Sequence, residues 1–214
     1  MIISFDGNVF SGKTSLIEAL FSLGKFNLIG EHSSFLNTDI FTHNVTASEM
    51  ATLLQHNYLE AEARRRSYIK VDEVNLIDRS FVSMAAHISA LNSVRGIDIR
   101  EWFLKEFNER LRMGKILVPD IYCFVRCGYD TIVERVGLNN SRNTDPIYYE
   151  EMYLKAIQDF NQAWSSRVGG TTIDTETVIP IRLAETLIQQ IPVSSQGGLD
   201  TQKIQNYLTE IVMK

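Results

Sequence analysis

The segment that most constrains the fold of this chain is a stretch of eight residues that follows a short apolar run. The run, 2–5, predicts a buried strand, and apolar residues at helical spacing predict a helix over 13–23. The stretch between them has the pattern G-x-x-x-x-G-K-[ST] and consists of Gly7, Asn8, Val9, Phe10, Ser11, Gly12, Lys13 and Thr14. Such a turn lets successive backbone N–H groups and a helix N-terminus point at one anion. The pattern therefore predicts a phosphate-binding loop, or P-loop, at residues 7–14.

Each part of this loop has an expected role in holding a nucleotide. We expect the backbone of residues 7–12, continued by Ser15, to surround the phosphates of ATP. Lys13 is expected to reach the β- and γ-phosphates, and the Thr14 hydroxyl is expected to ligate Mg²⁺. The motifs D-x-x-G and N-K-x-D, which GTPases normally add, do not occur in the sequence. The expected ligands are therefore ATP and Mg²⁺.

Short apolar strands alternate with helical patterns along the rest of the chain. Further strands are predicted at 26–29, 74–77, 121–125 and 172–173. This alternation is typical of βαβ units, so we expect an α/β, three-layer P-loop NTPase fold with a mainly parallel five-stranded sheet flanked by helices. The predicted domain covers 1–193 and includes a short lid around 137–145. A linker and a C-terminal helix are expected over 194–214.

Two helix starts have sequence signals of their own. Thr46 and Glu49 have the spacing of a capping box, which predicts that the second helix begins at Thr46. Asp145 followed by Pro146 predicts an N-cap and first turn for a helix that runs to about residue 168.

Composition limits the partners and the location of the protein. The net charge of −5 gives no general attraction to nucleic acid. No run approaches the roughly 20 apolar residues that span a bilayer, and the N-terminus lacks the features of a signal peptide. The two cysteines, Cys123 and Cys127, are expected to be free thiols. We therefore expect a cytoplasmic protein that binds small molecules, neither nucleic acid nor membrane, with a homodimer as one assembly to test.

Charged side chains follow two further strands. Glu31 comes after the strand at 26–29, and Asp78 and Arg79 come directly after the strand at 74–77. Because ligands of such folds bind beyond the carboxyl ends of the strands, these residues and the P-loop should converge on one edge. Asp78 is expected to hold Mg²⁺ opposite Thr14. Arg79 is expected to bind a phosphate, and Glu31 is expected to orient an acceptor or take its hydroxyl proton.

Two further arginine sites are candidates on the acceptor side. Arg64, Arg65 and Arg66 are consecutive, so they fan around a helix and only one or two can face a site. Arg64 is the expected substrate-binding member, although the sequence does not decide among the three. Arg142 lies in the predicted lid, where an arginine can neutralise charge on the transferring phosphate. The alternative for the arginine run is a favourable interaction with the negative C-terminal end of the helix, and the alternative for Arg142 is a solvated loop arginine.

These motifs resemble those of the thymidylate kinase and deoxynucleoside kinase group. The segment from Phe5 to Thr14 is similar to the loop of deoxynucleoside kinases, where Gly-Asn is typical. Asp78-Arg79-Ser80, with Ser83, resembles the Glu/Asp-Arg-Ser motif of those enzymes. Glu31 stands where both families carry a functional glutamate. The resemblance implies a kinase that transfers the γ-phosphate of ATP to a nucleoside or a nucleoside monophosphate.

The sequence also departs from these families, and the departures keep alternatives open. Gly30-Glu31-His32 lacks the arginine that thymidylate kinases have after the second strand, which favours a nucleoside acceptor. Met84-Ala85 stands where deoxynucleoside kinases usually have Asp-Arg. The interval between Arg64 and Asp78 resembles that of nicotinamide riboside kinase-like proteins, which is the first alternative. A non-catalytic, regulatory ATP-binding module is the second.

Overall fold

The computed structural model of the chain describes residues 1–36, 46–138, 146–190 and 201–214. Its centre is a five-stranded sheet with the order β2-β3-β1-β4-β5. The strands are β1 (Ile2–Asp6), β2 (Phe26–Ile29), β3 (Val74–Asp78), β4 (Ile121–Arg126) and β5 (Thr171–Asp174). Every neighbouring pair is parallel. The predicted parallel sheet is confirmed, and the five predicted strands lie within one or two residues of their expected bounds.

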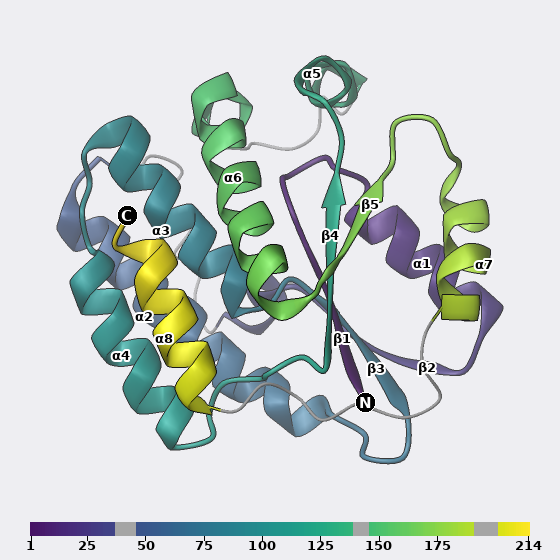
Figure 1. Cartoon of the computed structure of the whole chain (residues 1–214), viewed down its shortest axis with the longest axis horizontal. Helices are drawn as coiled ribbons and strands as arrows, with labels where there is room; N and C mark the ends of the chain where they lie inside the picture. The colour runs from purple at the N-terminus through teal and green to yellow at the C-terminus, as the bar shows by residue number, and fades with distance from the viewer. Residues whose placement is uncertain (37–45, 139–145, 191–200) are drawn as a thin grey trace.

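Helices cover both faces of this sheet, as Figure 1 shows. The α-helices are α1 (Lys13–Leu23), α2 (Ser48–Arg65), α3 (Phe81–Arg95), α4 (Arg100–Arg112), α5 (Tyr129–Leu138), α6 (Glu151–Val168), α7 (Pro180–Gln190) and α8 (Thr201–Val212). Short 3₁₀ helices are η1 (His32–Phe35), η2 (Arg66–Tyr68) and η3 (Pro146–Tyr149). On one side α1 packs against α7, and on the other α3 packs against α6. The predicted three-layer α/β fold is confirmed.

The two faces of the sheet bury separate hydrophobic clusters. Phe5 and Leu16 belong to the cluster beneath α1 and α7. Phe81 and Trp164 belong to the larger cluster beneath α3 and α6, where their rings meet edge-to-face with centroids 5.6 Å apart. Phe81 is fully buried and directly follows the candidate residues at the end of β3. Its burial therefore anchors the first turn of α3, next to the predicted site.

Both predicted helix starts are wrong in detail. The N-cap of α2 is Ala47, and the Thr46 hydroxyl contacts Met50 Sδ at 3.7 Å instead of a backbone amide. Residues 146–149 form the 3₁₀ helix η3, and α6 begins only after Glu150, whose backbone is extended. Asp145 lies outside the described residues. The spacing of residues along the chain predicted these starts, but both α-helices begin at later residues in the folded chain.

The C-terminal helix shares the main core. Ile204, Leu208 and Val212 of α8 are buried in the same cluster as α3 and α6. The predicted boundary between 193 and 194 lies outside the described residues, so the division of the chain at that point stays a prediction. Of the predicted lid, 137–138 end α5 and 139–145 lie outside the description. Within the described residues, no helix combines the length and hydropathy that crossing a bilayer requires.

Candidate active site

The P-loop begins at a glycine that no other residue could replace. Gly7 has φ of 138°, and a Cβ added there would lie 2.0 Å from the carbonyl oxygen of Val125 on β4. Gly12 has φ of 89° and directly precedes α1, so it also takes a conformation that side chains disfavour. The chain therefore passes close over the end of β4 and turns sharply into α1. This path is the cradle that the sequence pattern predicted.

Lys13 reaches back across the loop. Its Nζ donates to the carbonyl oxygens of Gly7, at 3.2 Å, and Asn8, and it lies 3.5 Å from Ser11 Oγ. Burial lowers the pKa of Lys13 to about 7, and the charge of Arg79 acts in the same direction. An anion in the loop would supply the negative charge that this buried amine lacks.

Thr14 and Asp78 meet across the sheet edge, as predicted. The Thr14 hydroxyl donates to Asp78 Oδ2 at 3.2 Å, while Asp78 Oδ1 is buried without a hydrogen-bond partner among the described residues. Hydroxyl and carboxylate oxygens suit Mg²⁺, so these two residues fit the predicted ion. In the described part of the chain, no three His, Cys, Asp or Glu residues are grouped as a metal site. Phosphate and water oxygens would therefore have to complete the coordination.

Glu31 and Arg79 form an ion pair beside the loop. Glu31 Oε1 lies 2.8 Å from Arg79 Nε, and Arg79 Nη1 donates to the Gly7 carbonyl oxygen at 3.0 Å. Burial alone would raise the pKa of Glu31, but the charges of Arg79 and Lys13 outweigh it and hold the pKa below its ordinary value. Glu31 is therefore an ionised carboxylate near neutral pH. Arg79 has φ of 62°, which is unusual for a residue with a side chain.

Asp6 organises the segment that follows β3, a role that sequence reasoning missed. Its carboxylate is fully buried and accepts hydrogen bonds from the Ser80 amide and hydroxyl, both at 2.8 Å, and from the Ser83 hydroxyl at 2.6 Å. The signal was present, because Asp6, Ser80 and Ser83 all belong to the motifs of the family resemblance. The pairing joins the start of the P-loop to the start of α3.

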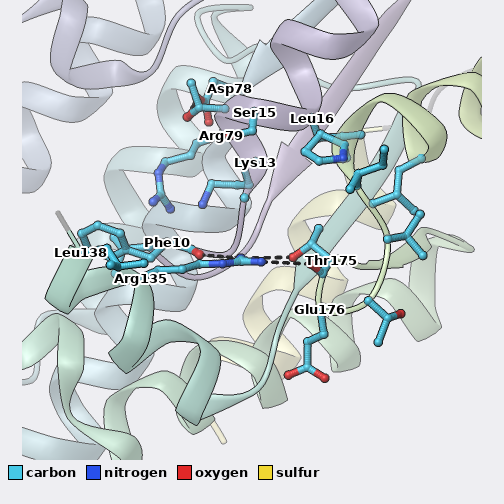
Figure 2. A pocket seen from close by; sticks show the side chains of 18 of the residues that line it. Phe10, Lys13, Ser15, Leu16, Asp78, Arg79, Arg135, Leu138, Thr175 and Glu176 are labelled. Carbon is cyan, nitrogen blue, oxygen red and sulfur yellow. Dashed lines mark hydrogen bonds between the residues drawn. The ribbon is translucent and has the colours of Figure 1, made fainter.

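A pocket of about 660 Å³ opens on the outer side of the P-loop. Figure 2 shows its labelled side chains, with Lys13, Asp78 and Arg79 on one side and Thr175 and Glu176 on another. The loop between β5 and α7 supplies the far wall, and its lining residues are Thr175, Glu176, Thr177, Val178 and Ile179. Sequence reasoning did not include this loop. The rule that ligands bind beyond the carboxyl ends of the strands, applied to β5, could have found it.

Arg135 on α5 joins the P-loop to that wall. Its Nη1 donates to the Phe10 carbonyl oxygen and its Nη2 to the Thr175 carbonyl oxygen, both at 3.0 Å. The Thr175 hydroxyl in turn donates to the Ser11 carbonyl oxygen at 2.6 Å. Three segments far apart in the sequence are thereby fixed around one opening.

The arginine run at the end of α2 points in three directions. Arg64 Nη1 donates to the Phe35 carbonyl oxygen at 2.6 Å, and Arg66 Nη1 donates to the Gly114 carbonyl oxygen. Arg65 is fully buried behind the end of β3. The predicted substrate role of Arg64 stays a prediction, and Arg142 lies outside the described residues.

The buried side of α2 carries another polar group, one turn before Tyr58. Gln55 is fully buried, and neither its amide nitrogen nor its amide oxygen has a partner in the described structure. Tyr58 lies one turn further along α2, and the centroid of its ring is 6.0 Å from the centroid of the His32 ring. Burial, followed by the charge of Glu31, raises the pKa of Tyr58. The Gln55 amide therefore has hydrogen-bonding capacity that no described residue uses.

Comparisons with known proteins identify the family of the chain. The chain matches the family model described as deoxynucleoside kinase over residues 3–195. No curated protein matches the chain by sequence at a significant level.

Solved structures show the same fold. The deoxyadenosine kinase from M. mycoides with bound dATP superposes with a TM-score of 0.69 at 16% identity, covering 88% of this chain and 100% of that one. Thymidylate kinase from Candida albicans superposes with a TM-score of 0.63 at 14% identity, covering 93% and 97%.

The family match extends over nearly the whole P-loop domain, including the loop itself, Glu31 and Asp78-Arg79. It confirms the predicted resemblance and the prediction of a phosphotransferase of the nucleoside kinase type, which binds a nucleotide phosphate donor. The family match favours this function over a nicotinamide riboside kinase-like protein and over a non-catalytic ATP-binding module. The chain belongs to the deoxynucleoside kinase family.

Proposed function

We propose that this protein transfers the γ-phosphate of ATP to a hydroxyl group of a deoxynucleoside, with Mg²⁺ bound beside the phosphates. The observation that carries the proposal is the Glu31–Arg79 ion pair, whose arginine also contacts the carbonyl oxygen of Gly7. A carboxylate and a guanidinium thus adjoin the loop where a terminal phosphate would face its acceptor. Phosphoryl transfer is accelerated by a group that orients the nucleophile and by a cation that neutralises charge on the transferring phosphate, and these two side chains can supply both.

The residues of this chain divide the reaction between them. Backbone amides of the P-loop and Lys13 would hold the β- and γ-phosphates, and Arg79 would neutralise charge that develops on the transferring group. Glu31, ionised near neutral pH, would accept the proton that the attacking hydroxyl loses. Mg²⁺ held by Thr14 and Asp78 would supply further positive charge. Little covalent chemistry is required, so positioning accounts for most of the catalysis.

The pocket beyond the P-loop suits the nucleoside part of ATP. Its volume of about 660 Å³ lies within the range of small-molecule sites. The side chains of Val178 and Leu183 give it an apolar wall, and Arg135 supplies a flat cation that can stack on a base. The donor base would therefore lie between α5 and the loop after β5.

The acceptor side favours a nucleoside over a monophosphate. His32, which follows Glu31, is buried against Glu62 and Arg65, so it offers no charge to an acceptor phosphate. The Gln55 amide, which has no partner among the described residues, offers two N–H donors and a carbonyl oxygen acceptor, which suits the edge of a nucleobase. These two features support a neutral acceptor with a hydrogen-bonding base.

The test is ADP formation across a panel of acceptors: the four deoxynucleosides, their monophosphates and nicotinamide riboside. We expect stimulation by at least one deoxynucleoside, and we expect Lys13→Ala to abolish it. Gln55→Leu should raise KM for that nucleoside and leave KM for ATP unchanged. Stimulation by nicotinamide riboside alone would support the first alternative. ATP binding without stimulation by any acceptor would support the regulatory module.

A further inference from the structure

Arg65 holds the backbone that carries the candidate catalytic residues. Its Nη2 donates to the carbonyl oxygens of Asp78, at 3.0 Å, and Arg79, at 2.9 Å. The side chain is fully buried, so these bonds form away from bulk water. One planar guanidinium thereby fixes two successive peptide units at the end of β3.

This strand end needs such support because its backbone is strained. Arg79 has φ of 62°, and a non-glycine residue in the left-handed region costs about 1 kcal/mol or more. The Arg79 N–H donates to the carbonyl oxygen of Phe5 on β1 at 3.0 Å, so β1 fixes the backbone of Arg79 at its N–H group. Arg65 holds the carbonyl side. The direction of the Arg79 side chain, towards Gly7 and Glu31, follows from this backbone conformation.

The same guanidinium also reaches the segment that carries Glu31. Arg65 Nη1 lies 2.8 Å from Glu62 Oε2 and 2.9 Å from His32 Nε2. His32 directly follows Glu31, and burial, followed by the charge of Arg65, lowers its pKa, so its ring is neutral near pH 7. Glu62 is itself fixed, because its other oxygen accepts from the Leu117 amide at 3.1 Å. Arg65 therefore contacts both segments from which the Glu31–Arg79 pair is built.

We propose that Arg65, balanced by the buried carboxylate of Glu62, is a positioning residue that sets the mutual geometry of Glu31 and Arg79. The proposal rests on the proposed function, since it concerns the same site. We assign Arg65 no contact with phosphate, because it is fully buried and its contacts among the described residues are with protein groups behind the strand end. Of the three consecutive arginines, it is the one whose guanidinium contacts the backbone of Asp78 and Arg79, so its effect on catalysis would be indirect.

The first test is Arg65→Lys, which keeps the charge but cannot donate to all four groups at once. We expect kcat to fall about 100-fold, since a displacement of about 1 Å in a reacting group has that effect, while the Kd for ATP stays within about twofold. Rates are normalised to the fraction of protein that binds ATP, so partial unfolding does not count as lost catalysis. The matched control is Arg66→Ala. Arg66 is the next residue along the chain and is exposed, so this variant should keep the wild-type kcat.

A second measurement separates positioning from folding. Arg65→Ala, assayed with millimolar guanidinium, should regain part of its normalised kcat, whereas methylammonium should not restore it. If Arg65→Ala does not fold, Glu62→Gln combined with Arg65→Met removes both buried charges, and this variant should bind ATP with low kcat. Normal kcat in the folded Arg65→Lys or double variant would overturn the positioning role while leaving the proposed function intact. Absence of phosphoryl transfer in the wild type would overturn both.

Discussion

Arg79 bridges two parts of the site by contacting Glu31 Oε1 through Nε at 2.8 Å and the Gly7 carbonyl oxygen through Nη1 at 3.0 Å. The carboxylate from the loop after β2 is thereby tied to the first residue of the P-loop. The residues expected to contact the acceptor and those expected to bind ATP are therefore linked by direct contacts. Substitutions at either end should therefore affect the transfer step more than they affect nucleotide binding.

Glu31→Gln should reduce kcat by about 100-fold or more, because the amide keeps the shape of the side chain but cannot accept the hydroxyl proton. KM for ATP should change little, since P-loop contacts to the phosphates remain. The measurement is steady-state ADP formation at saturating nucleoside. Glu18→Gln, at an exposed position on α1, is the control and should have wild-type activity. Equal kcat for Glu31→Gln and wild type would exclude a general-base role.

Asp6→Asn should destabilise the fold by about 2 kcal/mol, since the amide can accept at only one of the two oxygen positions and leaves buried donors unmatched. The affected donors are the Ser80 amide and the hydroxyls of Ser80 and Ser83. Urea unfolding measures the loss. Ser83→Ala removes a single donor and should cost less than Asp6→Asn. An unchanged unfolding midpoint in Asp6→Asn would show that this network does not support the strand ends.

Gly7→Ala should abolish ATP binding, because its methyl group would overlap the Val125 carbonyl oxygen, 2.0 Å away, and force the P-loop from its path. Gly137→Ala is the matched control. It lies in α5, and no described residue comes within 4 Å of an added Cβ, so the substitution should stabilise the helix by roughly 0.5–1 kcal/mol. Calorimetric titration with ATP and thermal unfolding check the pair. Wild-type ATP affinity in Gly7→Ala would contradict the geometry of the loop.

His87 should make stability fall on mild acidification. Burial, followed by the charge of Arg79, lowers its pKa to about 4. The pKa of a histidine in the unfolded chain is about 6.5. The unfolded state therefore binds more protons between these values, so stability is complete above the unfolded pKa and is lost as pH falls towards 4. This group alone should remove about 2 kcal/mol between pH 7 and about pH 5.

The check is the free energy of urea unfolding at both pH values for wild type and His87→Gln. Glutamine cannot titrate but retains a polar group near the Tyr153 hydroxyl, which lies 2.5 Å from His87 Nδ1 in the wild type. The variant should lose less stability on acidification. His56→Gln, at an exposed position on α2, should behave like the wild type. Identical acid losses in His87→Gln and wild type would disprove the assignment.

The local features of this protein could be predicted from the order of its residues. The glycine positions, Lys13 and Thr14 specified the P-loop, because turn conformation and helix start depend on neighbouring residues. Short apolar runs between helical patterns specified a parallel sheet, and the rule for strand ends brought Glu31, Asp78 and Arg79 to one edge. The ion pair and the Thr14–Asp78 hydrogen bond agree with that convergence.

The groups that support these residues became visible in the folded chain alone. Asp6 bonds to Ser80 across 74 positions, Arg135 to Phe10 across 125, and Thr175 to Ser11 across 164. Periodicity shows which face of an element is buried but not which strand or loop lies opposite. The same reason explains Arg65, because three consecutive arginines look equivalent until packing buries one of them behind the end of β3. The contacts depend on strand order, which is a property of the whole folded chain.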